Sequence, residues 1–364
     1  MKNFFSSTRG IITTGLVIGL LAVILQKLGN PGNMGLCVVC FERDLSGSLG
    51  LHRADVVQYA RPEIFGLVLG AFLAAMMTGE FRPRGGSSPV VRFFLGAIVA
   101  IGALVFLGCP WRALLRLAGG DWNAFFGLLG LFCGVGIGTF FFRQNFSLGR
   151  NNPGAKGLGL IFPLFILALL GLRLAFPPLE GEPKNDLLFY SLKGPGSLHA
   201  PLAASLGLAL VIGFLGQRSR FCSVGAFRDL ILFRQFHLFF GVVGFLAAAF
   251  VGNLIFGQFN PGFENQPIAH TQWLWNFLGL LIAGLASALA GGCPGRQLFL
   301  AGEGDGDAAC FSLGLMAGAA MAHNWSMASS GAGIGPHGVA AIVAGLAITL
   351  FVGFAFTKNA AQNG

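Results

Sequence analysis

The stretch "LGCPWRALLRLAGGD", residues 107–121, recurs as "GGCPGRQLFLAGEGD" at residues 291–305. Both copies read G-C-P-x-R-x-L, followed by L-A-G and then G-D. In each copy a proline follows the cysteine, and proline is favoured at the first position of a helix because its missing N–H would have no partner there. We therefore expect Cys109 and Cys293 to cap the N-termini of two short helices.

A second motif repeats in the same order along the chain. "CVVCFERD" at residues 37–44 matches "CSVGAFRD" at residues 222–229 as C-x-V-x-x-x-R-D. Two motifs that recur in one order and at nearly one offset indicate an internal duplication. Within a single membrane domain, 1–364, the duplication predicts a first repeat over 1–146, a connector with one span over 147–197, a second repeat over 198–327, and a C-terminal span and tail over 328–364.

The composition places these repeats in a membrane. Hydrophobic residues make up 54% of the chain and charged residues 10%, and the mean hydropathy is +0.74, which excludes an ordinary water-soluble domain. Apolar runs of roughly 18 to 22 residues, each able to cross about 30 Å of hydrocarbon, predict about ten spans. The first run lacks the cleavage site of a signal peptide and is counted as a span. The runs lie near 10–28, 61–79, 90–108, 122–142, 157–176, 198–216, 237–257, 273–292, 309–327 and 338–356.

An odd number of crossings separates matching spans, so the second repeat should be inverted relative to the first. Inverted repeats build transporter sites near the middle of the membrane, where broken helices meet. The two cysteine motifs of each half are too short to cross and too apolar for exposed loops, so we expect half-helices that enter from opposite faces. The predicted fold is an all-α polytopic membrane protein, hourglass-like, with about ten transmembrane helices plus four short re-entrant half-helices in two inverted repeats.

The charge distribution predicts orientation. The net charge of +9 includes no run of Lys and Arg, which argues against nucleic-acid binding. Basic residues are more frequent in the loops on the side of the termini, which include "EFRPRGG" at 80–86, "FRQNFSLGRNNPGAK" at 142–156 and "GQRSRF" at 216–221. Because cytoplasmic loops carry an excess of Lys and Arg, we expect both termini in the cytoplasm.

The paired cysteines are the main candidates for a substrate pathway. A helix N-terminus collects free N–H groups and partial positive charge, so it attracts anions and favours a thiolate. Sulfur beside such amides suits a soft sulfur or selenium anion. The alternative is that buried cysteine is a small hydrophobic residue, and Cys133 and Cys310, which lack symmetric partners, are interpreted in that way. The pathway candidates are Cys37, Cys109, Cys222 and Cys293. Cys40 is only an additional candidate, because it has no counterpart: Gly225 takes its place in the second repeat. A structural or redox pairing with Cys37 is the alternative for Cys40.

Four arginines accompany these cysteines. An ionisable residue at membrane depth is a functional candidate, so Arg43 and Arg228, each followed by Asp, either contact the substrate or brace a half-helix. Arg112 and Arg296 either hold the anion or extend toward water. Asp121 and Asp305 are expected to be helix N-caps. No catalytic residue, metal site or cofactor is predicted.

At these motifs the sequence resembles the YeeE/YedE family of membrane proteins, and within it the YedE subgroup associated with selenium metabolism. The resemblance covers nearly the whole chain, including "NMGLCVVCFERD", "RPEIFGLVLGAFLA" and "GALVFLGCPWRALLRLAGGDWNA". It implies an hourglass of inverted halves in the bacterial cytoplasmic (inner) membrane, and uptake of thiosulfate through transient S–H hydrogen bonds. That role would fall on Cys109 and Cys293, and on Cys37 in the outer half. It also implies a cytoplasmic carrier protein resembling SirA/TusA as a partner.

The sequence therefore predicts a protein that is not an enzyme and that admits a small sulfur or selenium anion, such as thiosulfate or selenite, by relay along cysteines. Its other predicted partner is membrane lipid. One alternative is a membrane thiol-disulfide oxidoreductase using Cys37 and Cys40. A second alternative is a channel for a neutral solute or a halide. The choice between sulfur and selenium, the coupling ion and the oligomeric state stay open at this point.

Overall fold

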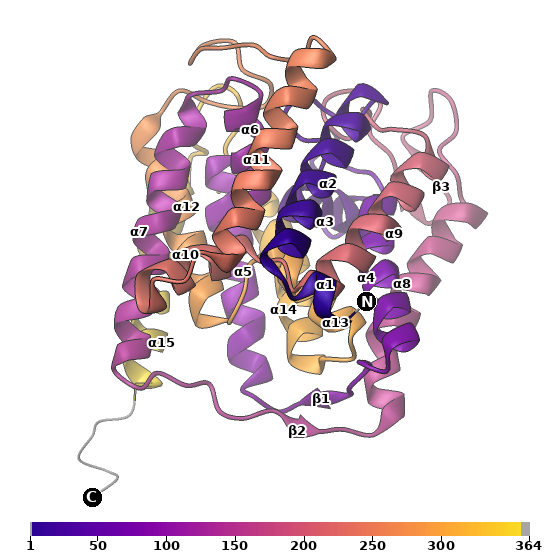
Figure 1. The fold of residues 1–364 in the computed structure, drawn as a ribbon. Helices are drawn as coiled ribbons and strands as arrows, with labels where there is room; N and C mark the ends of the chain where they lie inside the picture. Colours follow the sequence, from indigo (N-terminus) through magenta and orange to yellow (C-terminus); the bar gives the residue numbers. More distant parts are fainter. Residues whose placement is uncertain (1, 358–364) are drawn as a thin grey trace, which may run out of the picture.

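The computed structural model describes residues 2–357, and these residues form a bundle of helices (Figure 1). The only strands in this range are two short antiparallel pairs: β1 (Arg84–Gly85) with β2 (Asn152–Pro153), and β3 (Lys184–Asn185) with β4 (Leu188–Phe189). The predicted all-α polytopic membrane fold is confirmed. The long helices are α2 (Thr8–Lys27), α4 (Pro62–Thr78), α5 (Pro89–Phe106), α7 (Asn123–Arg143), α8 (Lys156–Ala175), α9 (Leu202–Ser219), α11 (His237–Ile255), α12 (Trp273–Leu289), α14 (Gly306–Asn324) and α15 (Gly338–Ala355).

Short helices stand where the cysteine motifs predicted half-helices. They contain 9 to 11 residues, too few to cross a membrane. Each begins directly after one of the four paired cysteines. They are α3 (Val38–Ser48), α6 (Pro110–Ala118), α10 (Ser223–Phe233) and α13 (Pro294–Gly302), and a further short helix, α1 (Lys2–Phe5), precedes α2.

Among the described residues, 8 helical stretches are long and apolar enough to cross a membrane by themselves, and three of these include α6, α10 or α13. The long helices α4 and α14 are not among them, because α4 is shorter and α14 is less apolar. Both lie inside the bundle, where α4 packs on α9 and α14 packs on α5 and α3. A helix that is surrounded by protein has little contact with lipid, so it needs less apolar surface than a peripheral helix.

The helix contacts follow the correspondence between the predicted repeats. α2 packs on α11 as α9 packs on α4, and α5 packs on α14 as α12 packs on α7. Matching helices run in opposite directions: at one end of the α2 and α9 pair Ala200 donates to Asn30 at 2.8 Å, and at the other Arg218 lies over the Phe5 ring. α5 and α12 are likewise antiparallel, since Arg92 at the start of α5 donates to the carbonyl of Ala290 at the end of α12.

Small residues let these helices approach closely. A Cβ atom on Gly213 of α9 would overlap the carbonyl of Leu67 on α4, and one on Gly134 of α7 would overlap the carbonyl of Leu281 on α12. Because the attraction between helices in lipid comes from close packing, glycine at these crossings strengthens the contact. The high glycine content, 57 residues, therefore has a packing role in this bundle.

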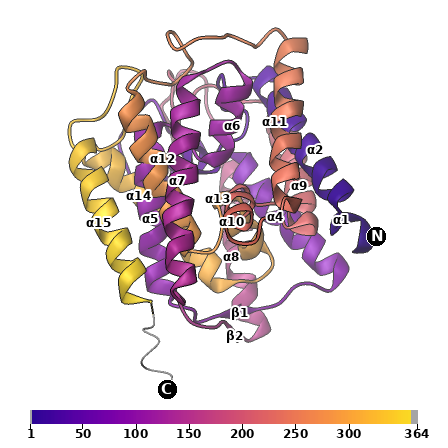
Figure 2. The ribbon, with the colours of Figure 1, turned by 60° about the vertical axis from the view of Figure 1, so that its left-hand side comes forward.

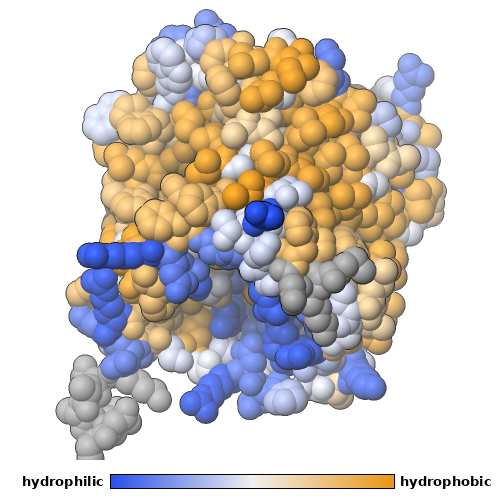
Figure 3. All heavy atoms as spheres, in the orientation of Figure 1, coloured by the Kyte–Doolittle hydropathy of each residue, from blue (hydrophilic) through white to orange (hydrophobic). Residues whose placement is uncertain are grey.

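The surface has the distribution expected of a membrane protein. In Figure 3 hydrophobic residues cover the upper and middle part of one face, and hydrophilic residues gather toward its lower end. Large apolar side chains on the outer helices are exposed, among them Leu158 on α8, Val243 on α11 and Phe351 on α15. Such side chains would be costly in water and suit contact with lipid.

Candidate functional site

Each paired cysteine is the N-cap of a short helix, which the sequence predicted for Cys109 and Cys293. Pro110 and Pro294 occupy the first positions of α6 and α13, where their missing N–H groups leave no donor unpaired. We call Cys37 with Cys109 the first corner, and Cys222 with Cys293 the second corner.

The two corners have the same internal hydrogen bonds. In the first corner, the Cys37 Sγ accepts from the backbone N–H groups of Cys40, at 3.4 Å, and Cys109, at 3.5 Å. In the second corner, the Cys222 Sγ accepts from Gly225 at 3.2 Å and from Cys293 at 3.4 Å. The structure thus brings the cysteines together in pairs, each at the meeting point of two helix N-termini. Such a point gathers N–H donors and partial positive charge.

The chain turns sharply just before α6 and just before α13. Leu107 and Gly291, at equivalent positions, both have left-handed backbone conformations, with φ of 65° and 91°. Glycine adopts this conformation easily, whereas leucine does so at a cost, so the first corner holds a strained residue. A Cβ on the next residue, Gly108, would lie 2.9 Å from the Cδ atom of Arg112, so glycine leaves room for that side chain to fold back over the turn.

Arg112 closes the first corner instead of reaching toward water. Its guanidinium is buried and donates to the carbonyl groups of Leu107, Asn33 and Ile268, the last at 3.1 Å. It also donates to the Cys40 Sγ at 3.7 Å. Ile268 belongs to the long loop between α11 and α12, so this arginine fastens that loop over the first corner.

The equivalent arginine of the second corner lies on an open cavity. Arg296 pairs with Glu303 at 3.3 Å, and in the described part of the chain no hydrogen bond joins it to the shorter loop between α4 and α5. The cavity, of about 360 Å³, reaches Cys222, whose exposed fraction is 5%, whereas Cys37 is fully buried. We call this cavity the basic vestibule. Its lining includes Arg218, Arg220, Cys222, Arg228, Asp229, His237, Gly291 and Arg296.

The basic vestibule favours anions. Arg218 pairs with Glu80 at 3.0 Å and Arg228 pairs with Asp229 at 2.8 Å. Arg220 has no ion-pair partner among residues 2–357 and is exposed. The four arginines therefore exceed the three carboxylates that pair with them or line the cavity, and an anion is drawn toward the cavity that leads to Cys222.

The repeated Arg-Asp motif has different surroundings in the two halves. Asp44 is fully buried between Arg43 and Arg61, at 2.7 Å from a nitrogen of each. Asp229 is 19% exposed and pairs only with Arg228 among the described residues. Arg43 is therefore enclosed in an ion-pair network, whereas Arg228 lines the vestibule.

Sequence reasoning missed four further residues, namely Arg116, Arg218, Arg220 and Arg61. Arg116 is fully buried and pairs with Asp121 at 2.6 Å, and its repeat equivalent is Leu300, so no repeated motif indicated it. Asp121 is expected to cap a helix, but Trp122 is the N-cap of α7. Asp121 instead accepts from the backbone N–H of Asn123 at 3.0 Å and neutralises Arg116. The cap prediction is wrong there. It is confirmed for Asp305, which accepts from Ala308 at 3.0 Å.

Arg218 and Arg220 of the vestibule were interpreted only as an orientation signal, in "GQRSRF". Their spacing at the end of a span, directly before a cysteine, was the available clue. No sequence pattern indicated Arg61, because its partner Asp44 lies on a different helix.

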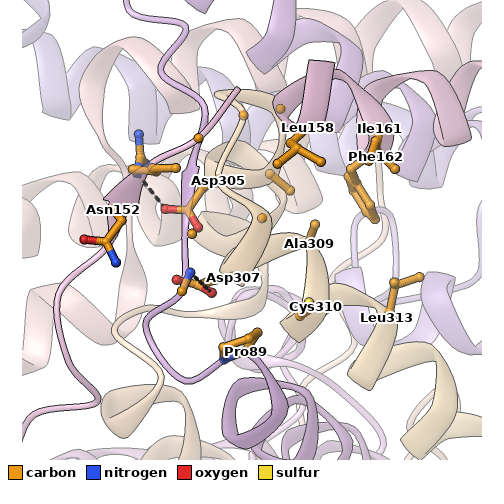
Figure 4. Close-up of a pocket in the computed structure, with 18 of the residues that line it drawn as sticks. Pro89, Asn152, Leu158, Ile161, Phe162, Asp305, Asp307, Ala309, Cys310 and Leu313 are labelled. Carbon is orange, nitrogen blue, oxygen red and sulfur yellow. Dashed lines mark hydrogen bonds and ion pairs between the residues drawn. The ribbon is translucent and has the colours of Figure 1, made fainter. Parts of the chain in front are cut away.

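Another cavity, of about 630 Å³, lies away from the corners between α8 and α14. Figure 4 shows Leu158, Ile161 and Phe162 on one side and Leu313 on the other. Its polar end is occupied by internal contacts, including the pair of Arg84 with Asp305 at 2.7 Å. Among the cysteines only Cys310 lines it, so this mainly apolar cavity is separate from the paired cysteines.

All seven cysteines are free thiols, and the described residues contain no cluster that could hold a metal ion. Cys40 is fully buried beside the first corner, whereas Cys133 and Cys310 are half-buried on α7 and α14.

Two curated thiosulfate transporters are similar to part of this chain. The thiosulfate transporter TsuA of Escherichia coli (strain K12) is 33% identical over 94 residues, which are 26% of this chain and 26% of that protein. The thiosulfate transporter TsuA of Spirochaeta thermophila is 33% identical over 99 residues, 26% of this chain and 29% of that protein. The match therefore spans less than a third of each curated relative.

The family described as Sulphur transport matches residues 1–137 and 218–361. These ranges contain both corners and most of the chain, and they confirm the predicted resemblance to the YeeE/YedE proteins. The chain therefore belongs to the Sulphur transport family, as an integral membrane protein.

Proposed function

We propose that this protein takes up a small sulfur or selenium anion, of which thiosulfate and selenite are the principal candidates, through the two corners. The observation that carries the proposal is the basic vestibule, which leads to the Cys222 thiol at the junction of two helix N-termini. Membership of a sulfur-transport family and the likeness to thiosulfate transporters over a quarter of the chain support the same cargo.

In this proposal the chain forms two inverted repeats with the boundaries given above. The last residues of the predicted tail, 358–364, lie outside the described residues. The side that carries β1 and β2 faces the cytoplasm of a bacterial cell, because the loops on it are rich in Lys and Arg. Both termini are then cytoplasmic, the basic vestibule opens inward, and the first corner faces outward beneath the loop between α11 and α12.

Transport proceeds by handing the anion between thiols. Each corner places two cysteines at helix N-termini, beside backbone N–H groups, so a thiol can donate to the anion while the amides stabilise its charge. Cys222 is the cysteine of the second corner that meets the vestibule, so it is the last to hold the anion before release. A cytoplasmic SirA/TusA-like carrier would accept the anion there.

The test is uptake of radiolabelled thiosulfate, and separately of selenite, into liposomes that contain the purified protein alone. We expect Cys109→Ser, Cys222→Ser and Cys293→Ser to reduce uptake to the level of empty liposomes, because a hydroxyl is harder and less acidic than a thiol. Cys133→Ser is the matched control, since this thiol lies on α7 outside both corners, and it should keep wild-type uptake. Wild-type uptake in all three corner variants would refute the relay.

The alternative function, thiol-disulfide exchange by Cys37 and Cys40, is supported by their proximity: the Cys40 N–H donates to the Cys37 Sγ at 3.4 Å. Mass spectrometry after rapid alkylation separates the two functions. An oxidoreductase must pass through a disulfide, whereas in a relay both thiols stay reduced and can be alkylated in samples taken at any time during turnover.

A further inference from the structure

The indole ring of Trp111 lies against the second corner. Trp111 is the second residue of α6, directly beyond the first corner, and it is 1% exposed. Its ring centroid lies 5.9 Å from those of Phe221, which precedes the cysteine of α10, and Phe299 on α13. A Cβ atom on Gly295, at the start of α13, would overlap the indole. The ring thus bridges from the helix of one corner to both helices of the other (Figure 2 shows α6 higher than α10 and α13).

This ring breaks the symmetry of the repeats. The first copy of the repeated motif reads G-C-P-W and the second reads G-C-P-G, so Gly295 stands where Trp111 would recur. Glycine there gives the indole its space, and a second tryptophan could not fit. The indole packs among Phe221, Phe245 and Phe299, so this contact between the helices of the two corners is made once and is not repeated by the symmetry.

The polar atom of this ring has no partner. Trp111 Nε1 is buried and has no hydrogen-bond partner within residues 2–357. A buried indole N–H normally finds an acceptor, because leaving it unpaired costs free energy. The indole N–H only donates, so its missing partner must be an acceptor such as an anion. The surrounding phenylalanine rings provide none.

We propose that Trp111 divides the two corners and that its Nε1–H donates a hydrogen bond to the anion as it passes from one to the other. This assigns to the pathway a donor that is not a thiol, and it rests on the proposed function. The ring has two separable parts in this role. The N–H stabilises the anion, and the apolar ring closes the space between the vestibule and the first corner to other ions.

Two substitutions separate these parts. Trp111→Phe keeps an aromatic ring and removes the N–H, and it should lower thiosulfate uptake by about 10- to 100-fold, the effect of losing one hydrogen bond to a charged group. Trp111→Ala removes the ring and should raise iodide leakage from loaded liposomes above that of wild type and Trp111→Phe. A merely structural tryptophan would not produce a leak. Trp122 is exposed at the start of α7. Trp122→Phe is therefore the control and should leave both rates unchanged.

A binding measurement accompanies the flux assay. Thiosulfate added to the detergent-solubilised protein should change tryptophan fluorescence in wild type and Trp122→Phe but not in monodisperse Trp111→Phe. If wild type transports and Trp111→Phe keeps both full uptake and the fluorescence response, the role of Trp111 is refuted while the proposed function stands. Absence of a leak in Trp111→Ala refutes the dividing role. If wild-type liposomes take up neither thiosulfate nor selenite, the proposed function fails and this inference fails with it.

Discussion

Asp44→Asn should destabilise this protein far more than Asp229→Asn, although the two residues occupy the same position of a repeated motif. Asp44 accepts from Arg43 at 2.9 and 2.7 Å and from Arg61 at 2.7 Å, and all three side chains are buried. Arg61 also donates to the carbonyl groups of the loop that precedes α9, including that of Leu198. Neutralising Asp44 leaves two buried guanidinium groups without a counter-charge.

The expected magnitudes follow from burial. Removing one partner from a buried ion pair costs about 3–5 kcal/mol, because the remaining charge stays desolvated. Asp229 and Arg228 are 19% and 32% exposed, so water screens them, and breaking such a pair costs about 0–1 kcal/mol. The free energy of unfolding should therefore differ between the two variants by at least about 2 kcal/mol.

The assay is unfolding of the purified protein by SDS in mixed micelles, followed by circular dichroism, with both variants and wild type in parallel. Uptake by the folded fraction of each variant is measured as well. Equal losses of stability in the two variants would refute the reasoning from burial. If Asp44→Asn keeps wild-type stability and abolishes uptake, the Arg43 network contacts the substrate and does not brace α3.

Two other predictions concern the charged groups at the two ends of the molecule. Arg220→Gln should lower thiosulfate uptake at low ionic strength, and the difference from wild type should shrink in high salt because exposed charges are screened. Arg150 is also exposed, so Arg150→Gln is the control. Equal effects of Arg220→Gln and Arg150→Gln on uptake would contradict the steering role of the vestibule. Burial lowers the pKa of three imidazoles in loops below the usual value of 6.5. The unfolded chain therefore binds more protons in acid than the folded chain, and the free energy of unfolding should fall as the pH is lowered from about 7 to about 5. A free energy of unfolding that stays constant over that range would contradict this prediction. The three residues are His52, His199 and His270.

The sequence alone determined the elements of this fold and the position of each cysteine within them. The long helices follow from apolar runs that match the thickness of a membrane, and the N-caps Cys109 and Cys293 follow from Cys-Pro in a duplicated motif. These are local signals, because hydropathy and proline act over one helix or one turn. The repeat likewise predicted that matching helices run in opposite directions, and α2 with α9 does so.

Only the tertiary structure decided how the two halves differ. The same motif gives a closed corner at Arg112, which the long loop between α11 and α12 covers, and an open vestibule at Arg296, which the shorter loop between α4 and α5 does not reach. It also placed Trp111 against Gly295 and Arg61 against Asp44. These contacts join residues from different helices, so their burial and charge pairing depend on packing that no local pattern in the sequence encodes.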